Sequence, residues 1–244
     1  MIVLDHLALG ARTLDDGWEL FCGVLGGKWL YGGDSAGFWW GQLEFLAGPK
    51  IELLRPTGGL SSEFLERFLA TRGPGPHHYN FLVPDIQDTL GRVRALGIEP
   101  VQVNLSSGRW QEAFLHPRDA FGFVIQVAQQ DGQPPALAAP AELPDAGSAS
   151  SFAVVEHHVA DMSGALALFR DALGGEIVRR EDPVTELVWP NGARIRLVQA
   201  ALGEGRGSIG ELVFARDGQG FSQDEISRAA DLSKRLGVVL NLDG

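Results

Sequence analysis

The pair Leu-Gly ends an amphipathic helical segment at four places in this chain, and each time a β-like segment follows directly. Glycine ends helices because it adopts the left-handed backbone conformation without the steric cost of a Cβ. Apolar residues ahead of each glycine recur at helical spacing. The recurrence predicts repeated strand-helix-strand units whose equivalent positions can be compared within one sequence. The four pairs are Leu25-Gly26, Leu96-Gly97, Leu173-Gly174 and Leu236-Gly237.

Further β-like segments follow the first three helices and give each unit the order βαβββ. These segments are rich in aromatic and β-branched residues, and turns such as Asn191-Gly192 separate them. The fourth unit ends after its second strand candidate, residues 238–242. We therefore predict an α+β fold in which tandem βαβββ modules build cupped mixed sheets and the last module is truncated.

A segment without periodic apolar residues divides the chain. Pro, Ala, Gly, Asp and Ser dominate residues 129–151, which is typical of a linker. We expect two paired-module halves on either side of it. The first half, 1–128, contains modules 1–57 and 75–128 joined by a helix over 61–72; the second, 152–244, contains module 152–199 and the truncated module 207–244.

Composition narrows the choice of partners. A net charge of −11 opposes nucleic-acid binding, because phosphate contacts need clustered Lys and Arg. No apolar run approaches the roughly 20 residues of a membrane span, and no signal peptide is indicated. The single cysteine, Cys22, excludes an internal disulfide framework and is expected in the core. These features favour a cytoplasmic protein, monomer or homodimer, that takes a small-molecule substrate or ligand rather than nucleic acid or membrane.

Overlaying the first two modules aligns two pairs of polar residues. His6 and His78 each precede the expected helix start by seven residues, and Glu52 and Gln126 each occupy the last strand of their module. Polar side chains in apolar strands are costly to bury unless they have partners. If two modules pair about a pseudo-twofold axis, two imidazoles, a carboxylate and an amide oxygen can converge as a divalent-metal site.

Strand alternation separates two neighbouring histidines. It places His78 on the same face as Asn80 and turns His77 the other way, so His78 is the expected ligand. The third module carries Val154 where the first has His6, which predicts that the C-terminal half has no such site. His157 and His158 are further candidate ligands, but they lie at the end of their strand and are expected in a solvated position or at the helix entry.

Three segments resemble the vicinal oxygen chelate superfamily, which includes glyoxalase I, methylmalonyl-CoA epimerase, extradiol dioxygenases and bleomycin-resistance proteins. They are residues 4–9, 75–86 and 114–126, and the resemblance is greatest to the epimerase and glyoxalase-like relatives. It implies paired βαβββ modules around a divalent metal, Zn, Mn, Co, Ni or Fe. The implied metal positions are His6, Glu52, His78 and Gln126.

This sequence departs from the epimerase pattern, because the carboxylate lies in module one and the amide in module two. An amide cannot abstract a proton, so the base must come from elsewhere than Gln126. The carboxylates considered for acid–base catalysis are Glu52, Glu112 and Glu44.

Four further residues are candidates for a substrate pocket. Asn80 shares the face of His78, and Trp110 begins a strand of module two. Trp39 and Trp40 are neighbours on one strand and so face opposite sides. One of the two is expected beneath the helices and the other in the pocket.

Three functions follow from these residues. The first is a metal-dependent glyoxalase-like enzyme, of isomerase, lyase or epimerase type, that acts through a metal-stabilised enolate-like intermediate. The second is a non-catalytic, drug-sequestering binding protein of the bleomycin-resistance type, with tryptophans as stacking surfaces. The third is an extradiol-type dioxygenase.

Overall fold

The computed structural model describes residues 1–35, 37–58, 62–132, 138–201, 207–218 and 220–243. Its elements follow the expected module order. Module one comprises β1 (Val3–Gly10), α1 (Asp15–Trp18), a π-helical continuation η1 (Glu19–Val24), β2 (Lys28–Ser35), β3 (Phe38–Glu44) and β4 (Lys50–Pro56). Helix α2 (Glu63–Arg72) leads to module two: β5 (Gly75–Leu82), α3 (Ile86–Ala95), β6 (Val101–Asn104), β7 (Trp110–Leu115) and β8 (Val124–Gln130).

The second half repeats this order. Module three comprises β9 (Ser151–Val159), α4 (Met162–Leu166), a π-helical continuation η3 (Ala167–Ala172), β10 (Glu176–Glu181), β11 (Val184–Val188) and β12 (Arg194–Gln199). Module four comprises β13 (Ser208–Ala215), α5 (Gln223–Arg235) and β14 (Val239–Asp243). None of the helices in the described ranges is long and apolar enough to cross a membrane.

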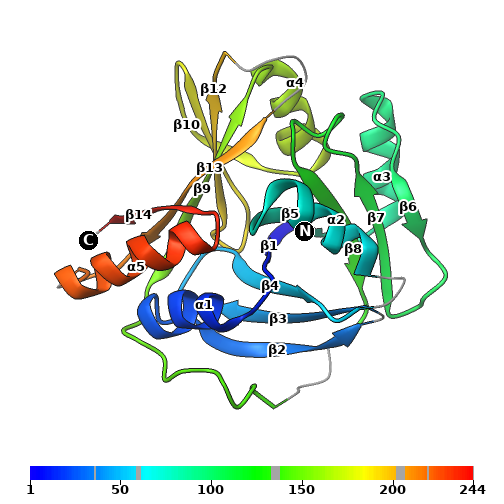
Figure 1. The fold of residues 1–244 in the computed structure, drawn as a ribbon. Helices are drawn as coiled ribbons and strands as arrows, with labels where there is room; N and C mark the ends of the chain where they lie inside the picture. Colours follow the sequence, from blue (N-terminus) through cyan, green and yellow to red (C-terminus); the bar gives the residue numbers. More distant parts are fainter. Residues whose placement is uncertain (36, 59–61, 133–137, 202–206, 219, 244) are drawn as a thin grey trace. The chain divides into compact units, whose positions relative to one another are not determined.

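The strands form two mixed sheets, which confirms the predicted α+β fold of βαβββ modules (Figure 1). Modules one and two supply an eight-stranded sheet in the order β2-β3-β4-β1-β5-β8-β7-β6, and modules three and four a six-stranded sheet in the order β10-β11-β12-β9-β13-β14. Antiparallel hairpins such as β2–β3 combine with parallel pairs such as β5–β8. Parallel pairing arises because a crossover helix separates the first strand of a module from the others.

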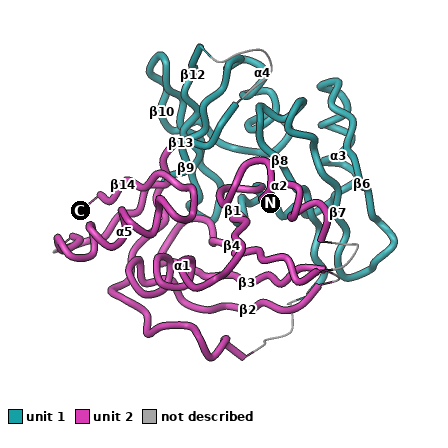
Figure 2. The backbone as a smooth tube through the Cα atoms, viewed as in Figure 1, with its two compact units in different colours: residues 1–6, 78–133, 154–210 teal, residues 7–77, 134–153, 211–244 magenta. Residues whose placement is uncertain are grey.

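The chain also divides into two compact units, shown in different colours in Figure 2. One contains Met1–His6, His78–Gln133 and Val154–Gly210; the other contains Leu7–His77, Pro134–Ala153 and Glu211–Gly244. Within the first, α3 contacts η3, and within the second, α5 contacts α1 and η1. Strand pairing thus follows the halves 1–128 and 152–244, whereas helix packing groups modules from both halves. The halves remain our proposal for the domain division.

The helix ends confirm the role of the four glycines, whose φ angles are all positive. Two of the helices change pitch before they end. Leu25 N donates to Leu20 O at 2.9 Å, and Leu173 N donates to Leu168 O at the same distance, so the last turns of modules one and three are π-helical. The last helix begins with a capping box, in which Ser222 and Glu225 each satisfy the other's backbone N–H.

His157 lies in the core of its unit, and the expectation of a solvated position was wrong. Its side chain is fully buried among Tyr79, Phe123 and Phe169, and its Nε2 donates to Phe121 O at 2.8 Å. Alternation along β9 explains this, since Val155, His157 and Val159 all point to the buried face. Burial lowers the pKa of His157 from 6.5 to about 4, partly offset by the hydrogen bond to Phe121.

This pKa predicts a pH-dependent stability. Because the pKa is lower in the folded than in the unfolded chain, the unfolded chain binds the extra proton first, and stability falls as the pH drops from 6.5 towards 4. The loss attributable to His157 is about 3 kcal/mol. Urea unfolding between pH 7 and pH 4 should show it, and His157→Gln should flatten that dependence. An equal slope in both proteins contradicts the assignment.

Candidate metal centre

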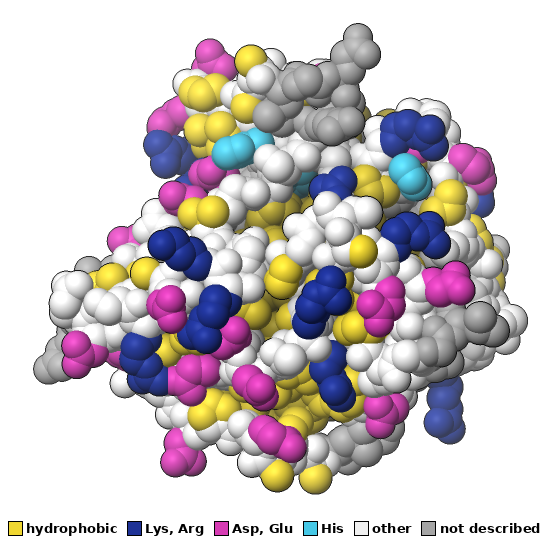
Figure 3. Space-filling model, in the orientation of Figure 1, with side chains coloured by type: hydrophobic (Ala, Val, Ile, Leu, Met, Phe, Trp, Pro, Cys, Tyr) yellow, Lys and Arg dark blue, Asp and Glu magenta, His cyan; other side chains and the backbone are white. Residues whose placement is uncertain are grey.

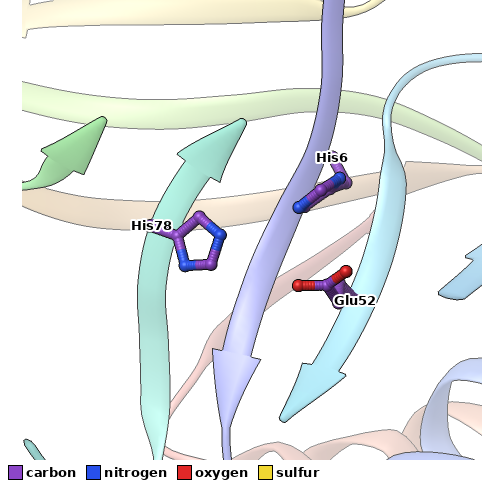
Figure 4. Close-up of side chains that lie close together, drawn as sticks. All are labelled: His6, Glu52 and His78. Atoms are coloured by element: carbon purple, nitrogen blue, oxygen red, sulfur yellow. The ribbon is translucent and has the colours of Figure 1, made fainter. Parts of the chain in front are cut away.

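Three buried polar side chains converge from three strands that are neighbours in the eight-stranded sheet. His6 comes from β1, Glu52 from β4 and His78 from β5 (Figure 4). One ligand atom of each lies within 4.8 Å of those of the other two. The two imidazole rings are 5.7 Å apart and inclined at 71°. The residues are 3%, 8% and 6% exposed, so the convergence lies away from bulk solvent.

The donor set fits a divalent transition metal. Two imidazole nitrogens and one carboxylate oxygen bind such ions at about 2.0–2.2 Å, which places ligand atoms roughly 3–4 Å from one another. The observed separations, all within 4.8 Å, are compatible with this geometry. Within the described ranges, His6, Glu52 and His78 are the histidine, cysteine or carboxylate side chains that lie close enough together to hold an ion. The same set suits Zn, Mn, Co, Ni and Fe.

Two further residues orient these ligands, and the sequence prediction missed both. His6 Nδ1 donates to Asp5 Oδ2 at 2.9 Å, which selects the tautomer that presents Nε2 as the ligand atom. Gln42 Nε2 donates to Glu52 Oε2 at 2.7 Å across the β3–β4 pair. The available signal was polarity, since Asp5 and Gln42 interrupt strands that are otherwise apolar or aromatic.

Asp5→Asn tests this orienting role. The asparagine keeps a hydrogen-bonding group beside His6 but removes the charge that makes the imidazole a stronger ligand. We expect metal affinity to fall by about tenfold, as for other residues that orient metal ligands. Calorimetric titration measures it, with the exposed Asp131→Asn as the control. An unchanged affinity in Asp5→Asn would show that the carboxylate has no part in the site.

Gln126 belongs to a hydrogen-bonded series in module two. Asn80 Nδ2 donates to Gln126 Oε1 at 2.7 Å, and Gln126 Nε2 donates to Glu112 Oε2 at 2.7 Å. Trp110 Nε1 also donates to Glu112 Oε2, at 2.9 Å. The amide oxygen of Gln126 has a second lone pair, so we keep it as the proposed fourth ligand. The series also places the carboxylate of Glu112 directly beside the amide of Gln126.

The remaining candidates lie in different surroundings. Glu44 is exposed at the end of β3, paired with Lys28 of β2. Trp39 packs against Trp18 of α1, with ring centroids 5.6 Å apart, so it lies on the helix side of the sheet. Trp40 faces the other way, the side of Gln42, and packs against α2 through an apolar cluster of Ala8, Leu54, Leu65 and Leu69. Both tryptophans of the pair therefore pack against a helix, and the assignment of one of them to the substrate pocket stays a prediction.

Module three has a different pair at the equivalent place. Glu186 and Arg196 face each other across β11 and β12, as Gln42 and Glu52 do across β3 and β4. Arg196 Nε lies 3.7 Å from Glu186 Oε2, and Arg194 donates to Glu186 Oε1 at 2.7 Å. A cation at the position of Glu52 repels a metal ion. Together with Val154, it explains why the described part of module three has no such group of ligands.

A family model for a glyoxalase-like domain matches residues 4–178, most of the chain. The chain belongs to the glyoxalase-like domain family. This glyoxalase-like protein is thereby a member of the vicinal oxygen chelate superfamily, as the sequence resemblance indicated. No curated protein matches its sequence at a significant level.

One solved structure shares the fold over most of the chain, and two others align with about half of it. A triple mutant of 4-hydroxymandelate synthase from Streptomyces coelicolor aligns over 95% of this chain and 75% of its own, with a TM-score of 0.61 and 10% identity. Methylmalonyl-CoA epimerase from Mycobacterium tuberculosis aligns over 53% of this chain and 89% of its own, with a TM-score of 0.47 and 24% identity. A hypothetical protein from Bacillus halodurans aligns over 55% of this chain and 98% of its own, with a TM-score of 0.48 and 29% identity.

Proposed function

We propose that this glyoxalase-like protein is a metal-dependent enzyme of the isomerase or lyase type, including epimerases, that acts on a small molecule with an acidic C–H beside a carbonyl. The observation that supports it best is the convergence of His6, Glu52 and His78, each from a different strand and each buried. Buried ionisable groups brought together in this way are expensive to fold and are characteristic of functional sites.

Each residue has a distinct role in this proposal. His6, Glu52 and His78 would hold the ion, with Gln126 as the fourth ligand, while Asp5 and Gln42 keep two of these side chains in position. A divalent ion held there supplies Lewis-acid stabilisation of negative charge that develops on a carbonyl oxygen. Asn80 and Gln126 lie along the same face and can bind further oxygens of the substrate.

Glu112 is the proposed base. Both of its hydrogen bonds end on Oε2, from Trp110 and from Gln126, so the carboxylate is fixed in direction while Oε1 can accept a proton. Glu44 is exposed beside Lys28 and lacks this fixation. A carboxylate that reaches the face from the neighbouring strand thus compensates for the amide at position 126.

Solvent deuterium exchange tests the proposal across a panel of substrates that share one reactive group. The protein loaded with Mn, Co, Ni, Zn or Fe is incubated in D2O with small carbonyl compounds and acyl thioesters that carry an acidic C–H. Mass spectrometry should show deuterium uptake that depends on the metal. Metal loading without any exchange or conversion favours a binding protein, and oxygen consumption by the Fe(II) form with catechols favours a dioxygenase; either outcome contradicts the proposal.

The single cysteine supports a reducing compartment. Cys22 is buried, and its Sγ donates to Pro144 O at 3.2 Å in the linker, so it contributes to packing. A chain with one cysteine has no internal disulfide to protect, which is usual in the cytoplasm. We therefore propose a cytoplasmic location, and a monomer or homodimer as the working form.

A further inference from the structure

A pocket lies between module one and the linker, on the face of the sheet that the metal ligands do not use. Its volume is about 540 Å³, within the range of small-molecule sites. Hydrophobic side chains gather over β2 and β3 with acidic side chains beside them, as Figure 3 shows. Its lining includes three tryptophans and several charged residues, among them Trp18, Trp29, Trp39, Asp34, Arg55 and Glu142.

Strand register places this pocket on the opposite face from the proposed metal centre. Asp34, Trp39 and Arg55 are direct neighbours across β2, β3 and β4, so their side chains share one face. Gln42, which orients Glu52, is three residues after Trp39 on the same strand and therefore points to the other face. A ligand in the pocket would have no access to the metal ligands through the sheet.

Three indoles form the apolar part of the pocket. The rings of Trp29 and Trp39 are stacked, with their centroids 6.0 Å apart. The ring plane of Trp18, from α1, is inclined at 75° to that of Trp29 and at 87° to that of Trp39. Gly32 and Gly41 face each other beneath them, and a Cβ at either position would overlap the indole rings. This glycine pair lets the rings lie close to the backbone, and Trp29 and Trp39 are only half-buried.

The charges around the indoles favour a cation. Three carboxylates, Asp15, Asp34 and Glu142, surround the pocket and exceed the one guanidinium, Arg55. All three carboxylates are exposed, so they attract a cation without having been desolvated. Tryptophan has the strongest cation–π attraction among the side chains. Arg55 can donate to an oxygen of the same ligand.

Module three has a cavity at the equivalent place but without the indoles. It measures about 660 Å³ and lies between the start of α4 and the β10–β11 hairpin, with Arg170, Arg180 and Asp182 in its lining. Both cavities thus arise from the module architecture, because the helix of each module leaves the hairpin of its second and third strands uncovered. Of the two cavities, the one beside module one is lined by three tryptophans, and the one in module three is lined by none.

We propose that the module-one pocket, formed by Trp18, Trp29, Trp39, Asp34, Arg55 and Glu142, binds an organic cation of the quaternary or tertiary ammonium class. The half-buried indoles of Trp29 and Trp39 supply cation–π contact, with the buried Trp18 packed against both. The carboxylates supply charge, and Arg55 supplies a donor for a hydroxyl or carbonyl oxygen. Choline is a suitable probe because its uncharged carbon isostere, in which carbon replaces the nitrogen, differs only in charge.

Calorimetry and tryptophan fluorescence should show that choline binds at least about tenfold more tightly than the isostere. Two variants should each weaken choline binding: Asp34→Asn and Trp39→Leu. Asp34 is exposed, so its substitution does not put folding at risk. Asp182→Asn, in the module-three cavity, and Trp110→Leu, on the metal-ligand face, should leave it unchanged. His78→Ala should also leave it unchanged, which separates this test from that of the proposed function.

Several results would overturn the proposal. Equal affinity for choline and its isostere would show that the pocket recognises apolar bulk alone. Preference for benzoate would show that Arg55 determines the ligand. Absence of saturable binding at millimolar choline, or binding that Asp34→Asn leaves intact or His78→Ala removes, would show that no cation site exists here.

Discussion

His6→Ala and His78→Ala are each expected to abolish stoichiometric metal uptake. Each removes one of three buried ligands whose donor atoms lie within 4.8 Å of one another. Because loss of a residue that merely orients a ligand costs 10- to 100-fold in affinity, loss of a ligand should cost more than about 100-fold. Elemental analysis and calorimetry with the five candidate metals measure the effect.

Two other histidines provide matched controls. His77 adjoins His78 but packs against Phe68 of α2, with ring centroids 4.8 Å apart, and His116 is exposed. His77→Gln and His116→Ala should therefore keep the metal. If His77→Gln loses it and His78→Ala keeps it, the choice between the neighbouring histidines is wrong. If neither ligand variant changes uptake in folded protein, the metal proposal fails.

Glu112→Gln should reduce catalytic exchange by about 100- to 10,000-fold, which is the usual contribution of a general base. Glutamine keeps the size of the side chain, and its carbonyl oxygen can still accept from Trp110 and Gln126. It removes only the ability to take a proton. Metal stoichiometry should therefore remain unchanged while the rate of solvent deuterium exchange falls.

Glu44→Gln is the control for this prediction. It makes the same chemical change on β3 at an exposed position beside Lys28. We expect full exchange activity in this variant. The reverse result, with activity lost in Glu44→Gln and kept in Glu112→Gln, would assign the proton transfer to the other carboxylate.

Local signals in the sequence predicted the elements well, because they depend on residues close in the chain. The four glycines after leucine do end helices with positive φ. The strand candidate 238–242 differs from the observed β14 (Val239–Asp243) by one residue at each end. The π-helical turns of η1 and η3 were not predicted, since a single shift from i−4 to i−5 hydrogen bonding leaves the apolar pattern similar.

Residues that repeat between modules were predicted, and residues that act through their neighbours were not. His6, His78 and Glu52 were found because modules one and two could be compared. Gln42 was missed because its importance depends on facing Glu52 across two strands. His157 was misplaced because its burial depends on which face of β9 the helices cover.

The sequence by itself determined the number of modules, their order and the half that retains paired polar residues, because these are properties of spacing along the chain. Only the tertiary structure decided which elements lie together. It brought β4, β1 and β5 side by side in one sheet, which unites ligands up to 72 residues apart. It also packed α5 against α1 and α3 against η3, so helices from different halves share a core. Such pairings depend on the burial of apolar faces between distant segments, and spacing along one chain does not specify them.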